Sequence, residues 1–180
     1  MSMQYRASLD GASKLITGGI LLMMAFLTYI DFFISRPPLL LSILLTVLFL
    51  GIIVGGYLYS PTGYILENRM LIIARPINKV SIALASITGA RILMKGETGT
   101  LIRIKGSGGF FGYYGNFRST RMGKLKLFAT RRNNRILITT NDDERLIITP
   151  DDLSIIQMIS DSMYSEQSHD QKSNAGKRSQ

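Results

Sequence analysis

The hydrophobic positions of the chain form two long uncharged blocks, followed by short alternating runs. The first block extends from Leu15 to Ile30 and the second from Pro37 to Ser60, with Asp31 in the link between them. Each block is close to the roughly 20 residues that an α-helix needs to cross a hydrocarbon core of about 30 Å. Their length and lack of charge argue against buried core helices. The pattern therefore predicts a transmembrane hairpin over residues 15–60, with spans at about 15–34 and 38–59.

Basic residues flank both blocks on the side away from the link: Arg6, Lys14, Arg69, Arg75 and Lys79. The link itself carries only Arg36. Because cytoplasmic flanks carry an excess of Lys and Arg, both termini are expected in the cytoplasm. We therefore predict a multi-pass protein of the inner cell membrane. A cytoplasmic segment over residues 1–14 would precede its hairpin.

After Ser60 the pattern changes to short apolar runs separated by Gly, Pro, Asn and Asp, which is typical of an antiparallel barrel or sandwich. The predicted strands are Tyr64–Leu66, Met70–Arg75, Val80–Ala83, Ala90–Met94, Leu101–Lys105, Leu125–Thr130, Arg135–Thr140 and Arg145–Thr149. Asn133-Asn134 and Asn141–Asp143 are predicted to be hairpin turns, because these residue types tolerate the left-handed conformation.

The last element is predicted to be an amphipathic helix that ends near Tyr164. Thr149 is suited to the N-cap and Pro150 to the first helical position. An apolar stripe with helical spacing follows: Leu153, Ile156, Ile159 and Met163. We therefore predict a domain over residues 61–164 and a disordered polar tail over residues 165–180.

The segment from Gly106 to Phe117 reads G-S-G-G-F-F-G-Y-Y-G-N-F, and Met122-Gly123-Lys124-Leu125 and Ile147–Asp151 follow it. This glycine-aromatic core, placed after a membrane hairpin, resembles that of small two-span proteins with a bacterial pleckstrin-homology-like (PH-like) domain. The resemblance implies a membrane α-helical hairpin plus an α+β PH-like domain. That domain would be an antiparallel barrel or sandwich of about seven strands, capped by a C-terminal helix. The resemblance implies no particular activity.

The glycine-aromatic core has two open interpretations. A dinucleotide-binding fingerprint is disfavoured, because the position three residues after Gly108 is Phe111. Five glycines are predicted to shape an ordered loop: Gly106, Gly108, Gly109, Gly112 and Gly115. Four rings would pack on the domain or contact the bilayer or a protein partner: Phe110, Phe111, Tyr113 and Tyr114.

Basic residues are concentrated in the same half of the domain, and the formal net charge is +9. Four of them are candidates for contact with anionic lipid or a partner: Arg118, Arg121, Lys124 and Lys126. Lys124 and Lys126 alternate with leucines, so both are predicted to lie on one face of a strand. A solvated basic surface is the alternative. Nucleic-acid binding is not expected beside a membrane anchor.

Residues for catalysis are scarce. There is no cysteine, and the single histidine, His169, lies in the polar tail. We predict no enzymatic activity, no cofactor and no metal site. The predicted function is a non-catalytic, membrane-anchored module that binds or scaffolds at the inner leaflet, through anionic headgroups, a protein partner or self-association.

The alternative is an accessory subunit of a transporter or envelope complex that acts through its hairpin. Gly51-x-x-x-Gly55 matches a helix-packing motif, which we interpret first as packing between the two spans.

Overall fold

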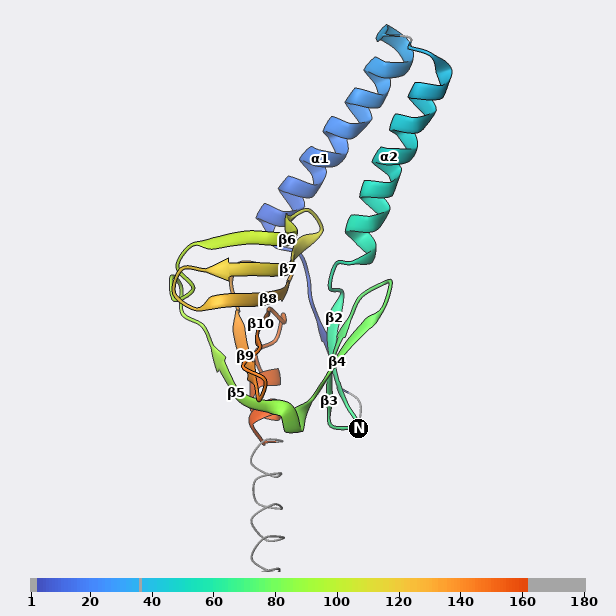
Figure 1. The fold of residues 1–180 in the computed structure, drawn as a ribbon. Helices are drawn as coiled ribbons and strands as arrows, with labels where there is room; N and C mark the ends of the chain where they lie inside the picture. The colour runs from blue at the N-terminus through green and yellow to red at the C-terminus, as the bar shows by residue number, and fades with distance from the viewer. Residues whose placement is uncertain (1–2, 36, 162–180) are drawn as a thin grey trace, which may run out of the picture.

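The structure is a computed structural model that describes residues 3–35 and 37–161 of the chain (Figure 1). It consists of two long helices that project from a domain of two β-sheets. The predictions for Arg36, Met163, His169 and the tail over residues 165–180 fall outside the described residues.

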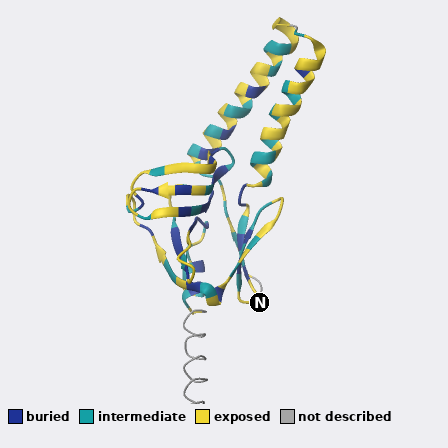
Figure 2. Cartoon of the chain, viewed as in Figure 1, coloured by how far each residue is buried: buried dark blue, intermediate teal, exposed yellow. Residues whose placement is uncertain are grey.

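The two long helices correspond to the two apolar blocks. Helix α1 covers Gly11–Tyr29 and continues into a π-helical segment, η1, at Ile30–Ser35, while helix α2 covers Leu39–Leu58. Asp10 caps α1, because its side chain accepts a hydrogen bond of 2.7 Å from the Ser13 N–H. Both helical segments, Gly11–Ser35 and Leu39–Leu58, are long and apolar enough to cross a membrane by length and composition. Only 11% and 6% of their most apolar windows are buried, so they do not form the core of the domain (Figure 2).

The first sheet has the order β1-β2-β3-β4 and is antiparallel throughout. Its strands are β1 (Met3–Arg6), β2 (Gly63–Glu67), β3 (Met70–Ala74) and β4 (Lys79–Ala83). Strand β1 was expected to be part of a separate N-terminal segment, but it pairs with β2 from Met3↔Leu66 to Arg6↔Gly63. The two long helices are therefore inserted between two neighbouring strands of one sheet.

The second sheet follows a 3-10 turn, η2 (Leu84–Ser86), and has the order β5-β9-β10-β8-β7-β6. Its strands are β5 (Ile87–Ile92), β6 (Leu101–Gly109), β7 (Gly112–Ser119), β8 (Gly123–Ala129), β9 (Ile136–Thr140) and β10 (Arg145–Ile148). Strands β8 and β10 are parallel, and the other pairs are antiparallel. The prediction of a mainly antiparallel barrel or sandwich is confirmed, with nine strands after the long helices in the described residues where about seven were expected.

The two predicted hairpin turns have different outcomes. Residues 141–143 do join β9 to β10 as an antiparallel hairpin, and Asp143 has a φ of 58°. The hairpin predicted at Asn133-Asn134 is wrong, because β9 lies on the far side of β10 from β8. The chain at Asn134, with a φ of 52°, instead crosses from one strand to a non-neighbouring one.

The main core lies between the sheets and is covered at one end by a C-terminal helix at residues 155–161, on which Ile155 and Ile159 are fully buried. The predicted helix start at Thr149-Pro150 is wrong. Thr149 is buried, and its hydroxyl oxygen accepts a 2.9 Å bond from the Thr130 N–H, tying the chain to the end of β8. The helix therefore begins several residues later, at Ile155. Just before it, the Asp152 carboxylate accepts a bond from the Ser154 N–H.

Tyr64 joins three parts of this core. Its hydroxyl donates a 2.6 Å bond to the Phe128 carbonyl oxygen and accepts a 3.0 Å bond from the Thr149 N–H. Burial is the main cause that raises the pKa of Tyr64 to about 12. In the unfolded chain a tyrosine ionises near pH 10. The stabilisation from the neutral phenol is therefore complete below about pH 10 and is lost as the pH rises toward 12.

Replacing Tyr64 with Phe should lower the free energy of unfolding by about 1–3 kcal/mol at pH 7, because two buried backbone groups lose their partner. It should also flatten the decline in stability between about pH 10 and 12. Thermal unfolding of the full chain in neutral detergent, followed by circular dichroism, would measure both effects. Tyr5→Phe is the matched control, since the Tyr5 hydroxyl donates only to the Met3 sulfur at 3.9 Å. Equal effects of the two variants would contradict this prediction.

Candidate functional site

The glycine-aromatic core forms the end of the β6–β7 hairpin. The prediction of a loop is wrong here, because most of these residues lie in paired strands. Gly106 pairs with Gly115 and Gly109 with Gly112, so the two strands stay paired to their ends. Phe110 and Phe111 alone form the turn, and Phe111 has a φ of 53°. The sequence pattern did not predict β7, because a strand rich in glycine lacks the usual alternation.

Gly106 and Gly115 allow the two strands to approach each other closely. Both have left-handed φ values, +122° and +111°. A Cβ on Gly106 would overlap the Tyr114 carbonyl oxygen and lie 2.8 Å from the Gly115 Cα. A Cβ on Gly115 would likewise meet the Gly106 Cα at 2.8 Å. These two positions therefore require glycine for both conformation and space.

The tip of the hairpin docks between the domain-proximal ends of the two long helices. On α1, the Ser13 hydroxyl donates a 2.7 Å bond to the Gly109 carbonyl oxygen, and the Thr17 hydroxyl accepts a 2.9 Å bond from the Phe111 N–H. On α2, the Gly56 carbonyl oxygen accepts a 2.7 Å bond from the Tyr114 hydroxyl. Both helices are therefore attached to the same β-hairpin.

The four rings divide into two pairs. Phe110 and Phe111 are half-buried at the helix ends, with 4.6 Å between their centroids, and Phe111 meets Tyr57 edge-on at 5.8 Å. Tyr113 and Tyr114 are each only 9% exposed, and burial raises the pKa of Tyr114. The two phenylalanines are therefore more exposed than the two tyrosines, and contact of these rings with lipid or a partner stays a prediction.

The sheet presents its edge strand β6 toward the helices. In Figure 1, β6, β7 and β8 follow one another away from the base of α1. Strand β6 is the last in the sheet order, so one of its edges has no neighbouring strand in the described residues. It exposes 56% of Ile102 and 61% of Ile104, while Arg103 and Lys105 are also exposed. The isoleucines were not among the predicted contact residues, although the alternation I-R-I-K was visible in the sequence.

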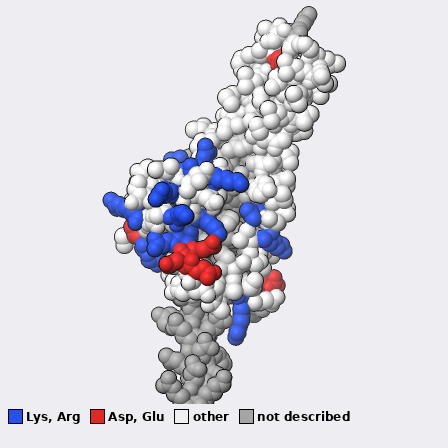
Figure 3. All heavy atoms as spheres, viewed as in Figure 1, with Lys and Arg blue, Asp and Glu red and all other residues white. Residues whose placement is uncertain are grey.

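The predicted basic residues lie on β7, β8 and the turn between them. Arg118 pairs with Lys124 across the two strands, and Lys126 pairs with Asn116, so the prediction that Lys124 and Lys126 share a face is confirmed. Lys126 also forms a 2.5 Å ion pair with Glu144. Arg121 lies in the turn and donates a 3.2 Å bond to the Gly96 carbonyl oxygen. Lys and Arg side chains gather on the domain below the mostly uncharged helices (Figure 3).

A cavity of about 880 Å³ lies at the junction between α2 and the domain. Ile52, Tyr59 and Phe110 form apolar parts of its wall, and Arg75 and Lys105 supply positive charge. The Arg75 guanidinium carbon lies 5.9 Å from the Tyr59 ring centroid and 5.6 Å from that of Phe128. Its buried Nε has no hydrogen-bond partner in the described residues. The cavity therefore combines cationic and apolar walls at the helix ends.

Four glycines of the two long helices do not pack the helices against each other. A Cβ on Gly18, Gly19, Gly51 or Gly55 would meet nothing within 4 Å. The interpretation of Gly51-x-x-x-Gly55 as an intramolecular packing motif is therefore wrong, and this face of α2 is open.

The potential metal ligands form no candidate metal site within the described ranges. Across residues 3–35 and 37–161, no group of three His, Cys, Asp or Glu side chains is arranged so that it could hold a metal ion. Asp142 and Asp143 lie in the β9–β10 turn, and Glu97 pairs with Arg91 at 2.5 Å. The Met94 N–H and then Arg91 lower the pKa of the Glu97 carboxyl. Glu97 therefore has a local partner, and Asp142 and Asp143 occupy positions that a turn favours.

The two-sheet domain with its C-terminal helix can be compared with known families. The family model described as bacterial PH domain matches residues 62–160, more than half of the chain. The chain belongs to the bacterial PH domain family. The matched region of this PH domain begins after α2, so β1 and both long helices precede it. No curated protein and no solved structure matches the chain.

Replacing Gly106 with Ala should destabilise the PH domain by at least about 2 kcal/mol, because the new Cβ would be strained and overlap the facing strand. Gly108→Ala is the matched control two residues away, where the nearest atom to a Cβ would be Arg103 Nη1 at 3.5 Å. It should change stability by less than about 1 kcal/mol. Thermal unfolding of the full-length variants in detergent would measure both values. Similar stabilities for the two variants would contradict the proposed requirement.

Proposed function

We propose that this protein is a non-catalytic PH module that its own transmembrane hairpin holds against the inner leaflet, where it binds anionic lipid headgroups. The observation that carries the proposal is the docking of the β6–β7 tip between the ends of α1 and α2. A domain on a free linker could turn any face to the bilayer. A domain that three hydrogen bonds attach to the two helices would present the same edge to the bilayer at all times.

The edge presented in this way has the composition of an interfacial segment. Strand β6 exposes Ile102 and Ile104, which would enter the boundary of the acyl chains. Arg103 and Lys105 alternate with them and would reach the headgroups. Phe110 and Phe111, at the helix ends, lie where aromatic residues are enriched in membrane proteins.

The basic residues behind this edge would add electrostatic attraction. A cationic residue near an anionic leaflet contributes about 1 kcal/mol, and the attraction falls off over a Debye length of about 10 Å. Arg118 and Lys124 are exposed and form no ion pair within the described residues, whereas Lys126 is neutralised in part by Glu144. The attraction should therefore be general for anionic lipids.

Depth measurements would test the leaflet contact. The chain has no cysteine, so single cysteines can carry a spin label on the full-length protein in vesicles. In vesicles that contain phosphatidylglycerol, we expect the labels at Ile102→Cys and Ile104→Cys to collide more with oxygen, which dissolves in the membrane, than with a water-soluble nickel complex. The control is Asp142→Cys, exposed in the β9–β10 turn, which should report water.

Charge removal would separate the electrostatic part. The variant that replaces Arg118, Arg121, Lys124 and Lys126 with Gln should move the β6 labels toward water in anionic vesicles and leave them unchanged in neutral ones. Water-like access at both β6 positions in both kinds of vesicle would refute the leaflet contact.

A second candidate function, as an accessory subunit acting through the spans, is favoured by the open glycine face of α2. A cysteine at Gly51 should then form a cross-linked adduct in native membranes. Ile53→Cys is the control, because two residues correspond to about 200° around a helix. Equal cross-linking at both positions, or none at either, would count against this candidate.

A further inference from the structure

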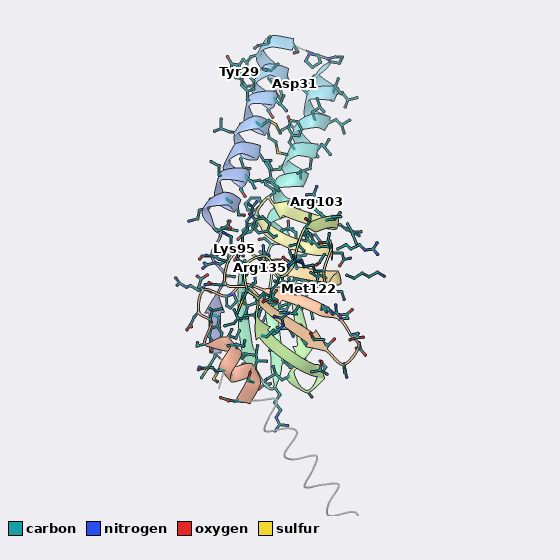
Figure 4. All side chains as sticks on the ribbon, turned by 90° about the vertical axis from the view of Figure 1, so that its left-hand side faces the viewer. Tyr29, Asp31, Lys95, Arg103, Met122 and Arg135 are labelled. Carbon is teal, nitrogen blue, oxygen red and sulfur yellow. The ribbon has the colours of Figure 1, made fainter. Side chains whose placement is uncertain are left out.

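A second cavity, of about 580 Å³, opens on the face of the six-stranded sheet that points away from the first sheet. Tyr113, Phe117 and Leu127 line it from neighbouring strands. Four arginines also line it: Arg103 from β6, and Arg131, Arg132 and Arg135 from the segment between β8 and β9. We call this cavity the arginine cleft. Figure 4 shows Arg103 near the helix ends and Arg135 further down the domain.

Neighbouring groups hold three of the four guanidinium groups of the arginine cleft in place. Arg132 Nε donates a 2.9 Å bond to the Tyr113 hydroxyl, and its guanidinium carbon lies 5.3 Å from the Tyr113 ring centroid. Arg135 Nη1 donates a 3.2 Å bond to the Thr98 hydroxyl. Arg131 is paired with Asp151 and also donates to Ser8. The cleft is therefore largely ordered without a ligand.

The positive charge of the arginine cleft is mostly uncompensated. Within the described residues, Arg131 is the only one of the four in an ion pair. The Asp10 carboxylate accepts bonds from the backbone N–H groups of Ser13 and Arg132, and within the described residues it forms no ion pair with an arginine of the cleft. Burial, and then the charge of Arg132, lowers the pKa of Arg135. Like charges are thus held together in a place where an anion would relieve their repulsion.

We propose that the arginine cleft binds a phosphate-bearing anion, as a phosphomonoester or diphosphate group. Guanidinium groups match phosphate oxygens in bidentate geometry, and several of them can share a multiply charged group. Two sources have this chemistry. One is a lipid headgroup, because Gly108 lines the cleft and adjoins the tip that is docked at the helix ends. The other is a soluble phosphate ester. This site does not depend on the leaflet contact of β6.

Calorimetry with the full chain in phosphatidylcholine nanodiscs tests the site, with inorganic pyrophosphate as the probe and sodium chloride of equal ionic strength as the blank. We expect saturable binding that Arg132→Gln with Arg135→Gln weakens about tenfold or more. Arg118→Gln with Lys124→Gln removes the same charge from the opposite face of the same sheet and should change the affinity less than about threefold. Arg132→Lys keeps the charge but not the bidentate geometry and should also weaken binding.

Nanodiscs that contain phosphatidic acid distinguish the two sources. Weaker pyrophosphate binding in these discs, but not in discs with phosphatidylserine, would identify a lipid phosphomonoester as the occupant. Unchanged binding would identify a soluble anion. Two results would overturn the proposal: no saturable binding of pyrophosphate in phosphatidylcholine discs, or equal weakening of that binding by the two double variants. Should the cleft variant fail to fold by circular dichroism, Arg103→Gln takes its place, because no hydrogen bond of its side chain supports the fold in the described residues.

Discussion

The arrangement of the molecule depends on the hydrogen bonds between the β6–β7 tip and the ends of the two long helices. A hairpin turn that lies between apolar helices has backbone groups that water reaches poorly, and an unpaired group of this kind is costly. Ser13 and Thr17 satisfy two of them from α1, and Tyr114 reaches the Gly56 carbonyl oxygen on α2. These bonds join the β6–β7 hairpin of the second sheet to both helices. They therefore fix the direction of the helices relative to that of the sheet.

The insertion of the helices between β1 and β2 reinforces the same coupling. The chain leaves the first sheet at Arg6 and returns to it at Gly63, directly opposite. Further backbone bonds tie each helix end to the domain: the Asp10 N–H donates to the Thr130 carbonyl oxygen at 3.2 Å, and the Ile77 N–H to that of Leu58 at 3.1 Å. A fragment that begins after α2 would lack a strand of its first sheet. The first sheet is therefore complete only when β1 and the two long helices precede β2.

The sequence was sufficient for features that depend on local periodicity. The apolar blocks predicted both helices, and alternation predicted most strands and the shared face of Lys124 and Lys126. Features that depend on distant partners were not predictable. Strand β1 is short and exposed and becomes a strand only through β2. Thr149 has the residue type of an N-cap, but Thr130 and Tyr64 use its polar groups from elsewhere in the chain. The tip of β7 is stable as a strand because glycines face glycines, a pairing that no single-strand pattern reveals.

The fixed orientation also separates the basic residues into surfaces with different surroundings. Side chains alternate across a sheet, so Arg118 and Lys124 lie on the face opposite Tyr113 and Phe117. The first pair is exposed and directly opposed across two strands, where water screens the repulsion. Arg132 and Arg135 instead border a cavity in which burial weakens that screening. The net charge of +9 therefore does not by itself indicate where an anion would be attracted to the protein. Residues of the same charge therefore have an exposed, screened setting on one face of the sheet and a partly buried one on the other.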